Sequence, residues 1–364
     1  MENPEPVFYF EGDDYFAALE RAIAGARVSV DVEVYYFAGD RVGVRFSDLL
    51  IRKASEGVRV RLIYDAIGCR GTSDDFFVKL DHAGVQVKVF HPLLDLGVNL
   101  TRRTHRKFFL IDGTVGFLGG FNLADEYSRE ASGDAAWRDT GVRLDEAPLV
   151  ESLRKLFSET WDGVHRKPRD FLRRRRHPAD WGKPRAEIVP NYGWQRKSLI
   201  RQEYLSAFVH AKKSILIANP YFVPDRGLRR ALRRAARRGV DVRVLTAGQS
   251  DVPIARWAGR AVYGGLLRAG VRIFEYSRRV LHAKSATADG SWYTVGTANI
   301  DHLSFFRNQE VNLFGFDPHR AFLLEAQFLK DVQYAEEVVW ETWRKRSWLE
   351  KLRERVFFWM RVWL

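Results

Sequence analysis

Apolar positions recur along the chain in two alternating patterns, a helical spacing of three to four residues and short runs rich in Val and Ile. "YFAALERAIAGARVSVDVEVYYF" (residues 15–37) has the pattern of an amphipathic helix followed by a β-branched strand. "FSDLLIRKASEGVRVRLIYD" (46–65) and "FVKLDHAGVQVKVF" (77–90) repeat the scheme, with a glycine closing each helix. This alternation is typical of an α/β domain with a mixed, largely parallel sheet.

The second half of the chain repeats the pattern in residues 204–224, 227–247 and 263–276. A chain of 364 residues is also long for a single core. We therefore predict two α/β repeats, residues 1–165 and 186–330, related by a pseudo-twofold axis and packed together with a site at their interface. Residues 166–185, with four consecutive arginines and several prolines, are predicted to be a basic connector, and 331–364 a helical tail.

One polar motif, H-x-K-x4-D-x6-G-[GT]-x-N, occurs in both halves at a constant separation of 177 residues. Its members are His105, Lys107, Asp112, Gly119, Gly120 and Asn122, and then His282, Lys284, Asp289, Gly296, Thr297 and Asn299. Each motif has the pattern of a β-hairpin, so its histidine and lysine share one face of a strand. The small residues would let the backbone approach a ligand closely, and the asparagines would supply amide donors.

Two imidazoles with two ammonium groups favour phosphoryl chemistry over metal binding. A neighbouring lysine repels a cation, and no carboxylate or cysteine stands at ligand spacing beside either histidine, so we expect no metal and no other cofactor. The lysines and asparagines can neutralise the charge that develops on a five-coordinate phosphorus. One histidine can attack phosphorus while the other protonates the leaving oxygen and later acts as base.

The duplicated motif resembles that of the phospholipase D superfamily. Within it, "HRKFFLIDGTVGFLGGFNLADEY", "WRDTGVRL", "NPYFVPD" and "HAKSATADGSWYTVGTANIDHLSFFRNQEVNL" are most similar to segments of bacterial cardiolipin synthases. The resemblance implies transfer of a phosphatidyl group from phosphatidylglycerol to an alcohol, with a second phosphatidylglycerol as acceptor and glycerol as leaving group. A phospholipid hydrolase or a phosphodiesterase nuclease with the same site is the alternative.

The resemblance also implies roles for individual residues. His105 would be the nucleophile and His282 the general acid and base. Asp139 and Glu310 would hydrogen-bond the histidines and fix their tautomers, whereas Asp112 and Asp289 would brace the hairpins. The sequence departs from the pattern in three features, namely the missing paired N-terminal transmembrane helices, Thr297 where serine is usual, and the polar run "SATAD" where apolar residues are usual.

The net charge of +13 favours an anionic partner. The N-terminal segment is acidic and has no signal-peptide pattern, and no run of about 18 to 20 apolar residues occurs. The single cysteine, Cys69, fits a reducing compartment. We therefore expect a peripheral protein on the cytoplasmic side of the cell membrane that binds anionic phospholipid and no nucleic acid.

The tail "SWLEKLRERVFFWMRVWL" (347–364) opens with a Ser347/Glu350 capping box and continues as an amphipathic helix. Its apolar face would comprise Trp348, Leu349, Leu352, Val356, Trp359, Met360 and Trp363. Such a helix either docks on the protein's own core or lies in the membrane interface, and aromatic side chains opposed by arginines favour the interface. The arginines at 229, 230, 233, 234, 237 and 238 are likewise either a solvated helix face or a patch for acidic headgroups.

Overall fold

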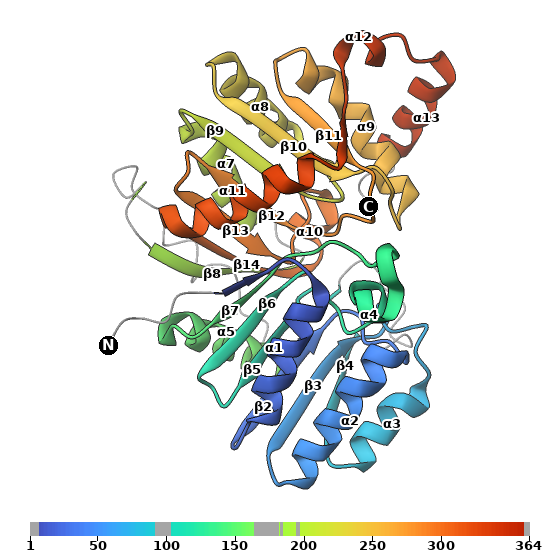
Figure 1. The fold of residues 1–364 in the computed structure, drawn as a ribbon, viewed down its shortest axis with the longest axis vertical. Helices are drawn as coiled ribbons and strands as arrows, with labels where there is room; N and C mark the ends of the chain where they lie inside the picture. Colours follow the sequence, from blue (N-terminus) through green and yellow to red (C-terminus); the bar gives the residue numbers. More distant parts are fainter. Residues whose placement is uncertain (1–6, 92–102, 164–181, 183–184, 194–196, 360–364) are drawn as a thin grey trace.

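The two sequence halves form two mixed β-sheets that pack against each other in the computed structural model (Figure 1). The structure describes residues 7–91, 103–163, 182, 185–193 and 197–359. The predicted basic connector therefore lies almost wholly outside the described residues. The prediction of two α/β repeats is confirmed.

The first sheet has seven strands in the order β1-β7-β6-β5-β2-β3-β4. Its strands are β1 (Val7–Tyr9), β2 (Ser29–Val34), β3 (Arg59–Asp65), β4 (Gln86–Phe90), β5 (Phe108–Ile111), β6 (Val115–Gly119) and β7 (Gly141–Leu144). The helical segments of this half are α1 (Gly12–Ala24), α2 (Arg41–Ser55), α3 (Asp74–His82), η1 (Asp125–Tyr127), α4 (Arg129–Ser132), η2 (Gly133–Ala135) and α5 (Ala147–Trp161).

The second sheet has eight strands in the order β15-β11-β10-β9-β12-β13-β14-β8. Its strands are β8 (Arg185–Tyr192), β9 (Ser214–Ala218), β10 (Asp241–Ala247), β11 (Arg272–Tyr276), β12 (Ser285–Ala288), β13 (Trp292–Gly296), β14 (Gln309–Phe316) and β15 (Ala335–Glu337). Its helices are α7 (Leu199–His210), α8 (Arg226–Arg237), α9 (Pro253–Leu267), α10 (His302–Phe306), α11 (Pro318–Val332), α12 (Trp340–Trp343) and α13 (Trp348–Trp359).

The sheets are mixed as predicted, but they are not largely parallel. Only three strands of each sheet run parallel, β2-β3-β4 and β9-β10-β11, and the remaining pairings are antiparallel. The helix–strand alternation accounts for the parallel strands, because parallel neighbours need a crossover. Each motif hairpin then returns the chain next to the first parallel strand, β5 beside β2 and β12 beside β9, and adds antiparallel strands.

A shared hydrophobic core joins the two halves. Phe108, Leu118 and Val142 of the first sheet belong to the same buried cluster as Val295 and Leu313 of the second. Helix α5 completes this cluster, whereas α1, α2 and α3 pack in a separate core of the first half and α7, α8 and α9 in one of the second. Because the buried cluster crosses the interface, the two motif hairpins are held in a fixed relation to each other.

The C-terminal segment is partly integrated into the second half. Helix α11 runs through residue 330, where the sequence predicted the tail to begin, and β15 pairs antiparallel with β11. The Ser347/Glu350 capping box forms, since the Ser347 backbone N–H donates to the Glu350 carboxylate at 3.0 Å and the Glu350 N–H to Ser347 Oγ at 3.3 Å. Helix α13 then packs along α9 (Figure 1).

Candidate active site

The two histidines lie on segments whose backbone pairs with a segment of the opposite half. The backbone N–H of His105 donates to the Gln309 carbonyl at 2.9 Å, and that of His282 donates to the Arg138 carbonyl at 2.7 Å. Thr104 and Leu281 form parallel bridges with Gln309 and Arg138 in the same places. Each motif is therefore hydrogen-bonded to the segment of the opposite half that carries an acidic residue, Glu310 or Asp139.

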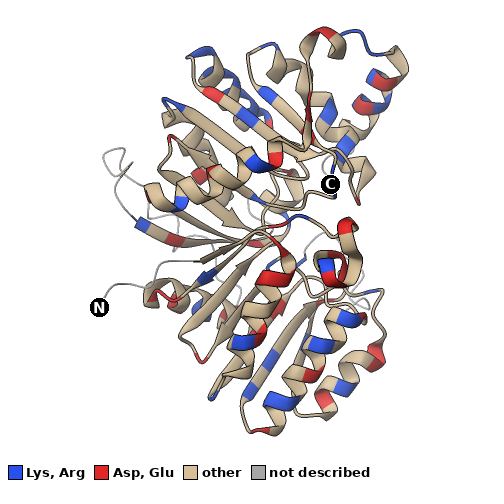
Figure 2. Cartoon of the chain, in the orientation of Figure 1, with Lys and Arg blue, Asp and Glu red and all other residues tan. Residues whose placement is uncertain are grey.

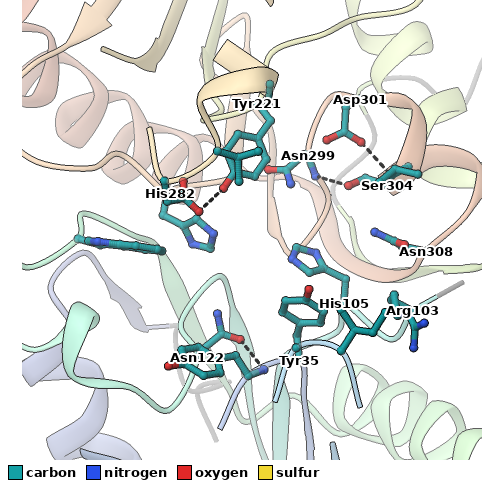
Figure 3. Close-up of a pocket in the computed structure, with 18 of the residues that line it drawn as sticks. Tyr35, Arg103, His105, Asn122, Tyr221, His282, Asn299, Asp301, Ser304 and Asn308 are labelled. Carbon is teal, nitrogen blue, oxygen red and sulfur yellow. Dashed lines mark hydrogen bonds between the residues drawn. The ribbon is translucent and has the colours of Figure 1, made fainter. Parts of the chain in front are cut away.

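The side chains repeat this crossed arrangement. Nδ1 of His105 lies 3.0 Å from the Glu310 carboxylate, and Nδ1 of His282 lies 2.5 Å from that of Asp139. Both carboxylates are fully buried. Because each Nδ1 faces a carboxylate, each Nε2 is left for the pocket, and Figure 3 shows the two imidazoles projecting toward each other from opposite halves.

The electrostatic surroundings of the two pairs differ. Burial raises the pKa of Glu310 to about 8, although Lys107 acts against this rise. Burial would also raise the pKa of Asp139, but Lys284 and His282 outweigh it and hold that pKa below its usual value. Burial and then the adjacent lysine lower the pKa of both His105 and His282. The anionic Asp139 thus makes His282 the imidazole with the stronger support for a cationic, proton-donating form.

Both motif lysines are buried next to their histidines and do not line the pocket. Lys107 Nζ donates to the His105 carbonyl at 2.8 Å, and Lys284 Nζ donates to the His282 carbonyl. Burial lowers the pKa of Lys107 to about 7 and also lowers that of Lys284. Burial thus disfavours the charged form of both lysines. An anion bound in the cavity would raise their pKa and restore their positive charge.

The motif asparagines line the pocket between the histidines (Figure 3). The Asn122 amide donates to the Tyr127 hydroxyl at 2.7 Å and its oxygen accepts the Tyr36 N–H at 3.2 Å. The Asn299 backbone N–H donates to Ser304 Oγ at 3.1 Å. The Asn122 amide is therefore held in place by neighbouring hydrogen bonds, whereas Oδ1 of Asn299 is buried without a hydrogen-bond partner at the edge of the cavity.

The small motif residues have a different place from the predicted one. Gly119, Gly120, Gly296 and Thr297 do not line the pocket. A Cβ at Gly120 would lie 2.1 Å from the Asp139 carboxylate, and one at Gly296 would lie 2.4 Å from Asn312 Oδ1. Thr297 Oγ1 donates to Glu310 at 2.5 Å. Gly120 therefore leaves room for the Asp139 carboxylate and Gly296 for the Asn312 amide, while Thr297 holds Glu310. That the backbone at these positions approaches a ligand stays a prediction.

The motif aspartates lie in the hairpin turns outside the pocket. Asp112 and Asp289 have positive φ values of 52° and 56°, and a glycine at 65° follows each, as a type I′ turn requires. The Asp112 carboxylate accepts three backbone N–H groups, those of Arg27, Val28 and Ser29, at 2.8 to 3.1 Å. The Asp289 carboxylate likewise accepts the backbone N–H groups of residues 212–214. Each aspartate thus ties its hairpin to the neighbouring strand.

The histidines open into one cavity of about 480 Å³ between the two halves (Figure 3). Residues that the sequence analysis did not single out also line it, namely Tyr35, Arg103, Tyr127, Trp137, Tyr221 and Asp251. Arg103 could be expected there, because residues 103, 105 and 107 alternate on one side of an extended segment. Tyr35 and Tyr221 lie near the ends of the repeated units 15–37 and 204–224, whereas Asp251 comes from a loop that carries no repeated pattern.

Aromatic rings surround both imidazoles. Tyr35 lies 4.9 Å from His105 between ring centroids, whereas Trp137 and Tyr127 lie 5.3 and 5.6 Å from His282. Such packing fixes the ring orientations and excludes water from their faces. No cluster of His, Cys, Asp and Glu suited to a metal ion occurs among the residues that the structure describes.

The sequence matches a known family over both repeats. Residues 19–161 and 204–332 match the family described as "Cardiolipin synthase, PLD-like domain". The chain is 35% identical to the major cardiolipin synthase ClsA of Bacillus subtilis (strain 168), over 95% of this chain and 72% of that protein. It is also 35% identical to the cardiolipin synthase of Listeria innocua serovar 6a, over 98% of this chain and 74% of that protein.

Solved structures share the fold at low sequence identity. The phosphatidylserine synthase of Haemophilus influenzae Rd KW20 superposes with a TM-score of 0.76 at 14% identity, covering 99% of this chain and 95% of that one. The polyphosphate kinase of Porphyromonas gingivalis superposes with a TM-score of 0.60 at 13% identity, over 89% of this chain and 50% of that one. The family match over both repeats and the 35% identity to cardiolipin synthases show that the chain belongs to the cardiolipin synthase family of phospholipase D-like proteins.

Proposed function

We propose that this protein is a cardiolipin synthase that transfers a phosphatidyl group from one phosphatidylglycerol to another. The observation that carries this proposal is the pair of histidines facing one cavity, each with a buried carboxylate of the other half at Nδ1. Relatives called cardiolipin synthases, 35% identical over nearly the whole chain, support the choice of lipid.

In the first step, Nε2 of His105 attacks the phosphorus of the donor. A P–N bond forms, the P–O bond to the glycerol headgroup breaks, and His282 gives its Nε2 proton to the departing oxygen. Asp139 supports the cationic His282 that this step requires. Lys107 and Lys284 supply positive charge behind the reacting phosphate.

In the second step, neutral His282 takes the proton of the acceptor hydroxyl. The hydroxyl oxygen of a second phosphatidylglycerol attacks the phosphohistidine, forming a P–O bond as the P–N bond breaks. The products are cardiolipin and one glycerol for two phosphatidylglycerols consumed. His105 and His282 end in their starting protonation states, so the cycle closes without a cofactor.

We also propose that helix α13 attaches the protein to the membrane surface. The free Cys69 of the protein favours the reducing, cytoplasmic side of that membrane. Glu354 anchors the helix to the second half, because this side chain is 3% exposed, pairs with Arg346 and lies 3.5 Å from Arg260 of α9. Phe358 packs against the core of the second half, but several other apolar residues face outward, with Trp348 70%, Leu352 51% and Trp359 80% exposed.

Basic side chains surround this exposed apolar face. Arg344, Lys345, Lys351 and Arg355 are exposed on the segment around α13. The arginine-rich helix α8 adjoins it through Arg229, which lies 5.2 Å from the Phe358 ring, and the blue segments along α8 in Figure 2 are arginines. Apolar side chains ringed by cations fit an anionic bilayer surface. No helix within the described residues is long and apolar enough to cross a membrane.

The decisive experiment incubates purified protein with phosphatidylglycerol vesicles and identifies the products by mass spectrometry. Cardiolipin and glycerol in equal amounts are expected. Phosphatidic acid as the main product would make the protein a hydrolase. Cleavage of single-stranded DNA faster than any phosphatidyl transfer would make it a nuclease.

A further inference from the structure

The walls of the active-site cavity are chemically unequal. Arg103 lies on the wall beside His105, whereas Tyr221 lies beside His282 (Figure 3). Asp251, in the loop before α9, lines the same cavity. A carboxylate is unexpected in a cavity that must receive a phosphodiester anion, because two anions repel each other.

Asp251 has no evident role in holding the fold together. Its Oδ2 accepts the Tyr221 hydroxyl at 2.6 Å. The N-cap residue of α9 is Val252, and no side chain caps that helix end. No ion pair to Asp251 forms within the described part of the chain. The carboxylate is exposed and is oriented by a half-buried tyrosine, so its other oxygen remains able to accept hydrogen bonds from a ligand.

Asp251 belongs to the His282 side of the cavity. The Tyr221 ring that holds it lies 6.5 Å from the His282 ring. Burial lowers the pKa of His282 and of Lys284, and the negative charge of Asp251 acts against that change on both groups. The wall beside His105 carries the guanidinium of Arg103 (Figure 3). Arg103 thus lines the cavity near His105 and Asp251 lines it near His282, while a second carboxylate, that of the buried Asp301, also lines the cavity.

If His282 protonates the leaving alcohol, the glycerol headgroup must lie on the His282 side, and the acceptor alcohol enters there later. Hydroxyl groups donate hydrogen bonds to a carboxylate, and such charge-assisted bonds are stronger than neutral ones. A cationic headgroup fits less well, because the ammonium of Lys284 already lies within electrostatic reach of Asp251.

We propose that Asp251, positioned by Tyr221, binds the hydroxyls of a polyol headgroup on the His282 side and selects glycerol-type alcohols over simple ones. This inference rests on the proposed phosphatidyl transfer and names the alcohol subsite of the same cavity.

The test is a competition between acceptor alcohols. Full-length protein receives phosphatidylglycerol in mixed micelles together with deuterated glycerol, ethanol and ethanolamine, and mass spectrometry measures the labelled phosphatidyl products. Asp251→Asn should lower the glycerol-to-ethanol product ratio by about ten- to a hundredfold, since a hydrogen bond to a charged group is lost. Tyr221→Phe should lower it in the same direction by a smaller factor, because Asp251 remains but is no longer oriented.

Asp48→Asn is the matched control, since Asp48 is an exposed acid that pairs with Lys79 on the outer helices. Its product ratio should equal that of the unaltered protein. An unchanged ratio in Asp251→Asn, or a loss confined to ethanolamine, would overturn the polyol subsite while leaving phosphatidyl transfer intact. Should Asp251→Asn be inactive with every acceptor, the ratio in Tyr221→Phe decides. Absence of any transfer by the unaltered protein would refute the proposed function itself.

Discussion

The Glu310 carboxylate lies 3.0 Å from Nδ1 of His105, although the two residues are 205 positions apart and belong to opposite repeats. Asp139 and His282 form the reciprocal pair at 2.5 Å, across 143 positions. Neither repeat therefore contains a complete histidine–carboxylate pair. The shared core between the sheets is what keeps both pairs assembled.

This crossed pairing predicts that each carboxylate is needed by the histidine of the other half. Asp139→Asn should lower kcat by about two to four orders of magnitude, because the amide neither fixes the tautomer of His282 nor stabilises its cation. The measurement is initial rate on a short-chain, monomeric phosphatidylglycerol, with the melting temperature as a check on folding. Asp134→Asn, at an exposed site, is the control. A folded Asp139→Asn variant with a rate within threefold of the unaltered protein would contradict the pairing.

The two histidines should differ in which one carries the intermediate. His282→Ala removes the proton donor, so with a donor that has a good leaving group the phosphatidyl group should accumulate on His105. His105→Ala should accumulate nothing. The measurement is intact-protein mass after an alkaline quench, followed by peptide mapping. An adduct on His282 in the His105→Ala variant would reverse the assignment of the two roles.

Much of the architecture follows from sequence because both halves carry the same local signals. Helix–strand alternation and the Asp-Gly turns at Asp112 and Asp289 specify the parallel strands and hairpins within a few residues. The antiparallel majority was missed, because the strands added after each hairpin have no periodic feature that fixes their direction. The duplication itself predicted where the histidines meet.

Other features of the site depend on contacts that local pattern does not encode. The crossed carboxylates require the relative placement of two sheets, which sequence spacing does not give. Asp251 lies on a loop without a repeated pattern, and its hydrogen bond with Tyr221 is a tertiary contact. The sequence predicts that the motif glycines let a ligand approach the backbone, whereas the space beside them is filled by protein groups such as the Asp139 carboxylate. The outward apolar face of α13 follows from the burial of Glu354 against α9, a tertiary contact.

Binding of an anion should be accompanied by proton uptake at Lys107. Burial lowers its pKa to about 7, so at pH 8 the free protein holds this amine mainly in the neutral form. A bound phosphodiester favours the ammonium and raises the pKa, so a proton is taken up on binding. Calorimetric titration of a non-hydrolysable phosphodiester in buffers of different ionisation enthalpy measures this uptake. Lys107→Met should reduce it, and equal uptake by both proteins would show that other groups are the source.

The hairpin aspartates should affect stability more than catalysis. Asn tolerates the left-handed conformation of Asp112, so Asp112→Asn removes the charge and one acceptor oxygen without backbone strain. We expect a loss of about 1–2 kcal/mol in the free energy of unfolding. Three backbone N–H groups and Lys53 outweigh burial and hold the pKa of Asp112 below its usual value. The contribution of Asp112 to the free energy of unfolding is therefore present above pH 4 and disappears as the pH falls through the lowered pKa. Urea denaturation at several pH values can follow this loss.

Helix α13 provides the test of membrane attachment. Because Leu352 and Trp359 face solvent while Glu354 anchors the helix, replacing both with serine should weaken sedimentation with phosphatidylglycerol vesicles and leave the melting temperature nearly unchanged. Each exposed cation nearby adds on the order of 1 kcal/mol to binding at moderate salt, so binding should also fall as salt is raised. Activity on a short-chain monomeric donor should persist, since α13 does not line the cavity. Phe322→Ser on α11, an equally exposed apolar site, is the matched control and should bind vesicles normally. If the double variant binds as well as the control, the exposed face of α13 serves some other contact; if it unfolds, these side chains belong to the core.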